Sequence, residues 1–229
     1  MKGIFYGVSV GPGDPEYMTL KAVRVLEQCP VVAAPRTEQG RSVALDIAAQ
    51  TTDLSAKEII YLDFLMSRDK QAVAERHREL AGLITVKLDA GQSVAMVNLG
   101  DASVYATYSY ILKLIREAGY ITETVAGVTS FSACAARLGI SLTEPRLPLR
   151  IIPGDYPQLE EELLRDGTKV VMKQGKGLER VKEALKTTGQ YQRAALVENC
   201  GMANESVYRK LDEAEGCGYF STILVGGEE

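Results

Sequence analysis

The sequence predicts an α/β protein of two domains, with a mainly parallel sheet in the first and a mixed sheet in the second. Short apolar, β-rich segments alternate with segments of helical periodicity along most of the 229 residues. This alternation restarts after Gly119. Near the end, two strand-like segments are separated only by a polar, glycine-containing turn. We therefore expect an N-terminal domain over residues 1–118 and a C-terminal domain over residues 119–229.

In the first half, each expected strand is followed by an expected helix. Strands are expected over residues 2–10, 31–34, 58–62 and 93–99. Helices are expected over residues 20–29, 42–50, 70–88 and 104–118. Thr19 is a suitable N-cap for the first helix, and Gly119 is a suitable C-cap for the last. Strands joined through helices of this length form right-handed βαβ units, which predicts parallel pairing.

The second half begins in the same way and ends differently. Strands are expected over residues 120–125, 149–152, 168–173, 194–199, 206–211 and 219–225. Helices are expected over residues 129–138, 157–165 and 178–186. The short separation of the last two strands suits an antiparallel hairpin, so the second sheet is expected to be mixed.

Composition and charge exclude several classes of protein. A net charge of −4 and a pI near 5.3 argue against a nucleic-acid partner. No apolar run reaches the roughly 18 residues of a membrane helix, and no export signal is visible, so we expect a cytoplasmic protein. The four cysteines form no C-x-x-C pair, and His77, expected to face water, is the one histidine. A zinc site and a Ser-His or Cys-His nucleophile are therefore not expected, and no metal site is predicted.

Two glycine-containing turns stand where ligands bind in open α/β sheets, at the carboxyl ends of strands. One has the sequence VGPGD at residues 10–14, and the other has LGD at residues 99–101. Neither suits a phosphate, because Pro12 and Pro15 withhold N–H groups and Glu16 occupies the third glycine position of a dinucleotide fingerprint. The glycines instead favour close approach of the main chain to a flat or bulky ligand.

These turns, together with GVTSFS at residues 127–132, resemble the tetrapyrrole methylase family, and the resemblance spans nearly the whole chain. Within the family, VENCGM at residues 197–202 followed by ESVY at residues 205–208 is most similar to the C-20 methyltransferases of precorrin-2 or cobalt-factor II. The resemblance implies methyl transfer from S-adenosylmethionine in cobalamin biosynthesis. It also implies a cofactor site between two α/β domains, S-adenosylhomocysteine as product, and a homodimer.

Carried over residue by residue, the resemblance implies a set of cofactor contacts. In the first half these are Pro12, Leu99, Gly100, Asp101, Val104 and Tyr105. In the second half they are Thr129, Ser130, Met172, Lys173, Cys200, Gly201, Met202 and Thr222. Simpler roles remain open for some of them, since Asp101 suits a helix N-cap and Met202 suits a core.

The chemistry implied needs few special side chains. Methyl transfer from a sulfonium requires a well-oriented acceptor in a water-poor site, and it requires no metal. The macrocyclic substrate carries eight carboxylates, for which Arg36 and Arg146 are candidate partners, while Tyr105 is a weak candidate for a general base. Two alternatives remain: the same fold acting on another acceptor (another corrin carbon or diphthine), and a tetrapyrrole-binding protein without catalytic activity.

Overall fold

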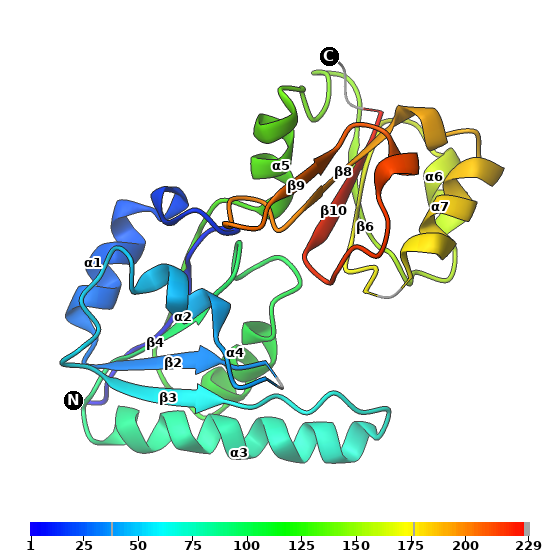
Figure 1. The fold of residues 1–229 in the computed structure, drawn as a ribbon. Coiled ribbons are helices and arrows are strands. Elements are labelled where there is room, and N and C mark those ends of the chain that lie inside the picture. Colours follow the sequence, from blue (N-terminus) through cyan, green and yellow to red (C-terminus); the bar gives the residue numbers. More distant parts are fainter. Residues whose placement is uncertain (38, 176, 227–229) are drawn as a thin grey trace. The chain divides into compact units, whose positions relative to one another are not determined.

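The computed structural model describes residues 1–37, 39–175 and 177–226, which fall into two compact units, Met1–Thr129 and Ser130–Glu229. The first unit contains a five-stranded parallel sheet (Figure 1). Its strands stand in the order β3-β2-β4-β1-β5. Their bounds are Phe5–Ser9 for β1, Val31–Pro35 for β2, Glu58–Leu62 for β3, Val94–Asn98 for β4 and Thr122–Val125 for β5. The predicted parallel pairing is confirmed.

Helices cover both faces of this sheet. The helices α3 (Lys70–Asp89) and α1 (Leu20–Gln28) lie on opposite faces (Figure 1). Apolar side chains of α3 and α4 (Tyr108–Glu117) share one core with the sheet, and those of α1 and α2 (Val43–Ala48) share the other. Every residue of the central strand β4 is buried, as expected for a parallel strand covered on both faces. Thr19 caps α1 as predicted, because its side chain accepts a hydrogen bond from Ala22 N at 3.1 Å.

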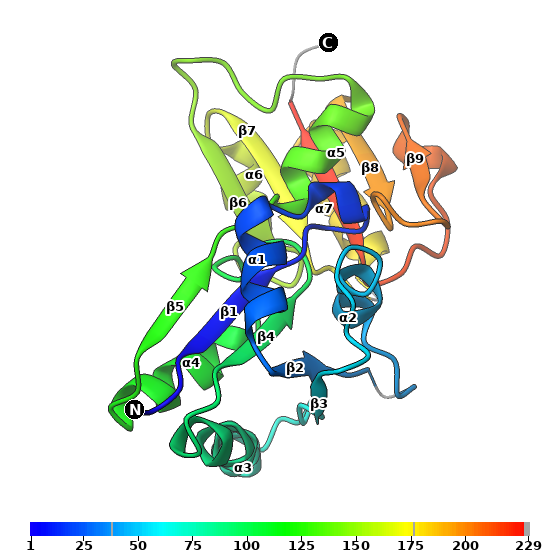
Figure 2. The same cartoon turned by 90° about the vertical axis from the view of Figure 1, so that its left-hand side faces the viewer.

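Two expectations about the end of the first half are wrong. The strand β5 pairs with β1 in the first sheet (Figure 2), whereas the sequence placed it in a second domain beginning at residue 119. The units divide between Thr129 and Ser130 because β5 finds its hydrogen-bond partners on β1. The helix expected from residue 104 begins at Tyr108, because residues 101–107 form an irregular turn in which Tyr105 has a φ of +49°.

The second unit contains a five-stranded mixed sheet in the order β6-β7-β10-β8-β9. The bounds are Leu149–Pro153 for β6, Thr168–Met172 for β7, Ala194–Glu198 for β8, Ser206–Tyr208 for β9 and Ser221–Val225 for β10. Only β6 and β7 pair in parallel, and the other three pairs are antiparallel. The predicted mixed sheet is confirmed. The predicted hairpin of the last two strands is wrong, because β9 and β10 do not pair with each other. The fully buried β10 lies between β7 and β8, and β9 pairs with β8 at the edge of the sheet.

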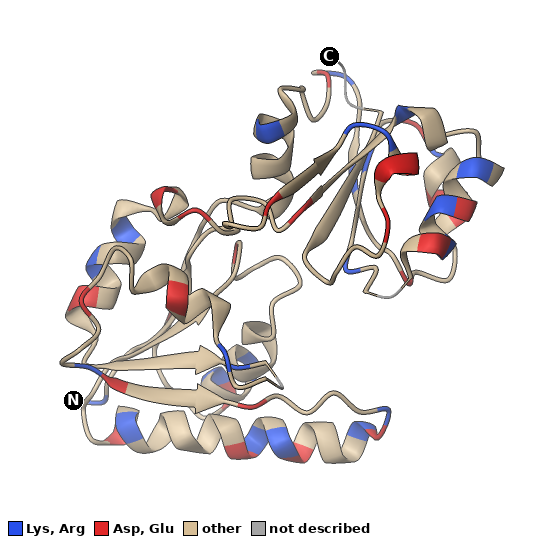
Figure 3. Ribbon diagram, in the orientation of Figure 1, with Lys and Arg blue, Asp and Glu red and all other residues tan. Residues whose placement is uncertain are grey.

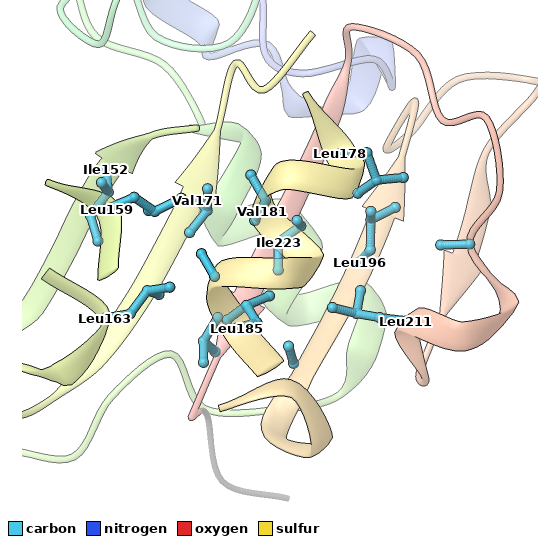
Figure 4. Close-up of a cluster of buried hydrophobic side chains, with 14 of the residues drawn as sticks. Ile152, Leu159, Leu163, Val171, Leu178, Val181, Leu185, Leu196, Leu211 and Ile223 are labelled. Carbon is cyan, nitrogen blue, oxygen red and sulfur yellow. The ribbon is translucent and has the colours of Figure 1, made fainter. Parts of the chain in front are cut away.

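One apolar core joins this sheet to the helices α6 (Leu159–Leu164) and α7 (Leu178–Thr187) (Figure 4). Leu159 and Leu163 of α6 and Val181 of α7 are buried against Val171 and Ile223 of the sheet. The helix α5 (Ser130–Leu138) contacts β10. Short 3-10 helices occupy Pro15–Tyr17, Tyr191–Arg193 and Leu211–Glu213. Among the described residues, no helix combines the length and apolar character needed to cross a bilayer.

Candidate functional site

The turns that follow β1 and β4 are joined through their main chains. Gly11 N donates to Gly100 O at 3.2 Å, and Gly100 N donates to Gly11 O at 2.7 Å. Both glycines have positive φ values, +75° and +71°, which side chains strongly disfavour. A Cβ added at Gly100 would have no atom within 4 Å, so open space adjoins the main chain there. The two turns singled out from the sequence therefore form one structure, with open space beside the Cα atom of the otherwise buried Gly100.

The Asp101 carboxylate is held by donors of its own unit. Oδ1 accepts hydrogen bonds from Ser103 N at 2.8 Å and from Ser103 Oγ, and Oδ2 accepts one from Gly127 N at 2.7 Å. Burial acts to raise the pKa of Asp101, but the hydrogen bonds from Ser103 and Gly127 outweigh it and hold the pKa below its usual value. Asp101 thus ties the turn after β4 to the turn after β5.

The remaining first-unit candidates line the same turns. Pro12 is buried, Leu99 and Val104 are half-buried, and Tyr105 is 43% exposed. A tyrosine with φ of +49° costs about 1–3 kcal/mol of backbone strain, and such residues concentrate at functional sites. Burial raises the pKa of Tyr105, so its hydroxyl is protonated at neutral pH.

In the second unit, the candidates gather around Thr222 at the start of β10. The strand register places Thr222 opposite Met172 of β7 and opposite Val197 of β8. Thr222 Oγ1 donates to Ser130 Oγ at 3.3 Å, which brings the first turn of α5 to the same point. Thr129 precedes Ser130 and is the last residue of the first unit.

Glu205 shapes the turn after β8, which carries the candidates Cys200, Gly201 and Met202. Its Oε2 accepts a hydrogen bond from Gly201 N at 2.8 Å, and its Oε1 pairs with Arg137 of α5. Burial opposes ionisation, but these two partners hold the pKa of Glu205 below its usual value. The turn is therefore fixed to α5.

A hydrogen bond between the buried thiols of Cys134 and Cys200 ties the same turn to α5. It raises the pKa of Cys134, and burial acts in the same direction. It lowers the pKa of Cys200, against the opposing effect of burial. Cys200 in the candidate turn and Cys134 on α5 are thus a buried pair of free thiols.

The turn after β7 is strained. Lys173 directly follows the strand with a φ of +57°, and its Nζ donates to Tyr219 Oη at 2.8 Å. The next residue, Gln174, is buried, and both atoms of its side-chain amide are without a hydrogen-bond partner. After β8, Asn199 also has a positive φ, +50°. Among the described residues other than glycine, positive φ therefore occurs only in turns that carry or adjoin candidate residues.

The two arginines proposed for the substrate lie in other turns, one after β2 and one before β6. Arg36 follows β2, and its guanidinium binds the carboxylate of Asp63 through two hydrogen bonds, at 2.8 Å and 2.6 Å. Its side chain is 33% exposed and lies over the ring of Tyr61. Arg146 is exposed in the loop before β6. Positive and negative side chains alternate on α3 and α7, so these helices offer no single-sign surface (Figure 3).

Sequence reasoning missed the residues that brace the turns. Ser9 and Gly127 connect the first-unit turns, and Glu205 fixes the second-unit turn through hydrogen bonds. The only available signal was the placement of Gly127 and Glu205 within the motifs used for the resemblance. His77 was also misjudged, because it is half-buried and stacks on Tyr110 with ring centroids 4.7 Å apart.

A separate cavity of about 210 Å³ lies elsewhere in the second unit. It is lined at the start of β8 and the end of β10, by residues that include Ala194, Ala195 and Leu224. Because β8 and β10 are antiparallel, this is the opposite end of the sheet from Cys200 and Thr222. It contains none of the candidate residues. Within the described ranges, no group of three or more His, Cys, Asp or Glu side chains could hold a metal ion.

The family profile described as Tetrapyrrole (Corrin/Porphyrin) Methylases matches residues 5–215. The chain belongs to this family. Among relatives of this tetrapyrrole methylase, the cobalt-precorrin-2 C(20)-methyltransferase of Salmonella typhimurium is 32% identical, with 98% of this chain and 97% of the relative covered. The probable cobalt-precorrin-2 C(20)-methyltransferase of Methanocaldococcus jannaschii is 36% identical over 73% of this chain and 71% of its own length.

Solved structures of other methylases have the same fold. A cobalt precorrin-4 methyltransferase superposes with a TM-score of 0.81 at 23% identity, covering 97% of this chain and 94% of that chain. The uroporphyrin-III C-methyltransferase of Thermus thermophilus, solved in complex with S-adenosylhomocysteine, gives a TM-score of 0.72 at 26% identity, covering 98% and 92%. The resemblance and the two-sheet fold predicted from the sequence are thereby confirmed.

Proposed function

We propose that this protein transfers a methyl group from S-adenosylmethionine to C-20 of precorrin-2 or its cobalt form, in cobalamin biosynthesis. The observation that carries the proposal is near full-length similarity to the cobalt-precorrin-2 C(20)-methyltransferase of Salmonella typhimurium, and a second such relative is 36% identical over 73% of this chain. The joined turns around Gly100 support it. They offer main-chain groups and open space at the carboxyl edge of a parallel sheet, where ligands of such sheets bind.

The residues present fit this cofactor. S-adenosylmethionine supplies an activated methyl group on a sulfonium, so the protein needs no nucleophile or metal of its own. In the first unit, main-chain groups near Gly100 would hold the cofactor, with Leu99 and Val104 supplying apolar contact. In the second unit, the polar pair Ser130 and Thr222 and the turn carrying Gly201 are the proposed contacts.

The chain's contribution to the reaction is positioning. Holding an acceptor carbon in line with the transferring group is worth about 7–11 kcal/mol. Strained turns at Tyr105 and Lys173 and the braces at Asp101 and Glu205 supply the rigidity that positioning requires. Tyr105 has a raised pKa and suits a lining role better than that of a base.

The substrate's carboxylates call for basic partners at exposed turns. Arg36 and Arg146 are the proposed partners, and Arg36 would bind the substrate with its remaining exposed surface while paired to Asp63. We further propose a homodimer, as the family resemblance implies, and a cytoplasmic location. Light scattering should give a mass near twice 24.9 kDa for the dimer. Cell fractionation should recover the protein in the cytosolic fraction.

The deciding experiment supplies carbon-13-methyl S-adenosylmethionine with precorrin-2 and, separately, with its cobalt form. The expected product gains one methyl group, located at C-20 by carbon-13 NMR. A methyl group at another carbon would contradict the C-20 proposal. Tight tetrapyrrole binding without methylation would instead favour a binding protein.

A matched pair of variants tests the place of the cofactor. Gly100→Ala and Gly119→Ala both put a side chain at positive φ with no neighbour within 4 Å, so both impose similar backbone strain of about 1–2 kcal/mol. Only Gly100→Ala would fill space beside the joined turns. We expect it alone to weaken S-adenosylhomocysteine binding in calorimetry, and equal affinities would refute this placement.

A further inference from the structure

Ser9, the last residue of β1, is fully buried and lies where three strands of the first sheet end. Its hydroxyl donates a hydrogen bond to Val125 O, the last residue of β5, at 2.6 Å. The same oxygen accepts a hydrogen bond from Ala102 N, in the turn after β4, at 2.9 Å. One oxygen atom thus connects the ends of β1, β4 and β5.

The turn after β5 fits against this hydroxyl without spare room. A Cβ added at Gly127 would lie 2.4 Å from Ser9 Cβ and 3.0 Å from Gly100 O. Gly127 N also donates to Asp101 Oδ2 at 2.7 Å. Contacts among Ser9, Gly127 and Asp101 therefore set the distance between the turns after β4 and β5. Gly100 belongs to the same group, because its carbonyl oxygen lies against Gly127.

We propose that Ser9 is a positioning residue for the methyl donor: its buried hydroxyl holds the main chain at Gly100 in the geometry that binds the cofactor. This inference rests on the proposed function. Ser9 has no exposed surface, so it acts through the turns rather than by touching the ligand. Removing the hydroxyl would leave Ala102 N and Val125 O without their partner, and the turns would move or admit water to satisfy them.

The test compares Ser9→Ala with Ser42→Ala, a substitution of the same type at another buried position of the same unit. Ser42 caps α2 by accepting from Leu45 N at 3.4 Å, outside the joined turns. Both variants should lower the melting temperature. Ser9→Ala should weaken S-adenosylhomocysteine binding by about five- to tenfold, the order of one hydrogen bond, while Ser42→Ala stays within about twofold. Equal affinities would overturn the inference.

Steady-state kinetics give a second readout that a purely structural role would not change. Because Ser9 is assigned to the donor geometry, Ser9→Ala should raise KM for S-adenosylmethionine more than KM for the tetrapyrrole. A change in neither KM, or the same change in both, would overturn the assignment.

Gly127 provides an independent variant that removes no hydrogen-bonding side chain. Gly127→Ala should weaken S-adenosylhomocysteine binding because its methyl group collides with Ser9 Cβ. Because Ser9→Gly removes the atom struck in that collision, the double variant should lose less affinity than the sum of the two single losses. If the two substitutions instead add independently, the coupling is absent and the inference fails. If the unmodified protein binds no S-adenosylhomocysteine, the proposed function fails, which is a different outcome.

Discussion

Replacing Asp101 by asparagine should destabilise the first unit and weaken cofactor binding together. The carboxylate accepts hydrogen bonds from Gly127 N, Ser103 N and Ser103 Oγ. An asparagine of the same shape offers one oxygen acceptor, and its NH₂ group would face an N–H donor. At least one backbone N–H would then lose its acceptor. Water cannot easily replace that acceptor, because Asp101 is only 8% exposed.

The size of the effect follows from these bonds. A hydrogen bond to a charged group contributes about 1.5–3 kcal/mol, so Asp101→Asn should cost about 2 kcal/mol and Asp101→Ala about 4 kcal/mol. For a unit of this size, each kcal/mol lowers the melting temperature by about 4 °C. Asp101→Asn should therefore melt about 8 °C below the unmodified protein at pH 7.

The lowered pKa of Asp101 determines how its contribution to stability changes with pH. The folded pKa of Asp101 lies below its unfolded value, so its stabilising contribution is present above about pH 4 and disappears as the pH falls through the folded pKa. The difference in melting temperature between the unmodified protein and Asp101→Asn should be constant from pH 5 to 8 and narrow below about pH 4.

Circular dichroism melts from pH 3 to 8 measure the stability, and calorimetry with S-adenosylhomocysteine at pH 7 measures the affinity. Asp53→Asn is the control, because Asp53 is exposed and accepts a local hydrogen bond from Ser55 N at 2.9 Å. Its substitution should change the melting temperature by less than about 2 °C. The reasoning is refuted if Asp101→Asn melts like Asp53→Asn, or if its deficit persists unchanged to pH 3.

Three further outcomes are expected. Tyr105→Phe should keep kcat within about threefold, whereas a loss of a hundredfold or more would identify the hydroxyl as the general base. Gln174→Met should raise the free energy of unfolding by about 1 kcal/mol in urea titrations, because it removes two buried polar atoms without partners, and a decrease would contradict this. Glu205→Gln should weaken S-adenosylhomocysteine binding by loosening Gly201, while exposed Glu160→Gln should not; equal affinities would count against the brace.

The sequence predicted the fold class because its local patterns agree with the final structure. Buried β4 and its glycine-containing turn could be recognised from apolar residues followed by LGD. The assignment of β5 failed because residues 122–125 do not encode which sheet they join, and that choice depends on pairing with β1. The hairpin failed for the same reason, since two short segments close in sequence pair with β8 instead of each other.

The candidate site was predictable only where a turn has a local signature. The glycines at 11 and 100 are visible in the sequence, but the bond of the Ser9 hydroxyl to Val125, 116 positions away, is not. The pairing of Arg36 with Asp63 likewise depends on β2 and β3 being neighbours. Side-chain partners across a sheet are tertiary facts, so residue type alone made Arg36 look more available than it is.

The position of β10 has a consequence for how the second unit is made. Residues 221–225 leave the ribosome after every other strand of their sheet, yet they lie in its middle and bridge β7 to β8. Until they emerge, no strand connects β7 to β8. The apolar side chains of α6 and α7 can then pack against only part of the sheet. Residues 221–225 must therefore be synthesised before this half of the protein can fold, whereas the first half can be complete before they emerge.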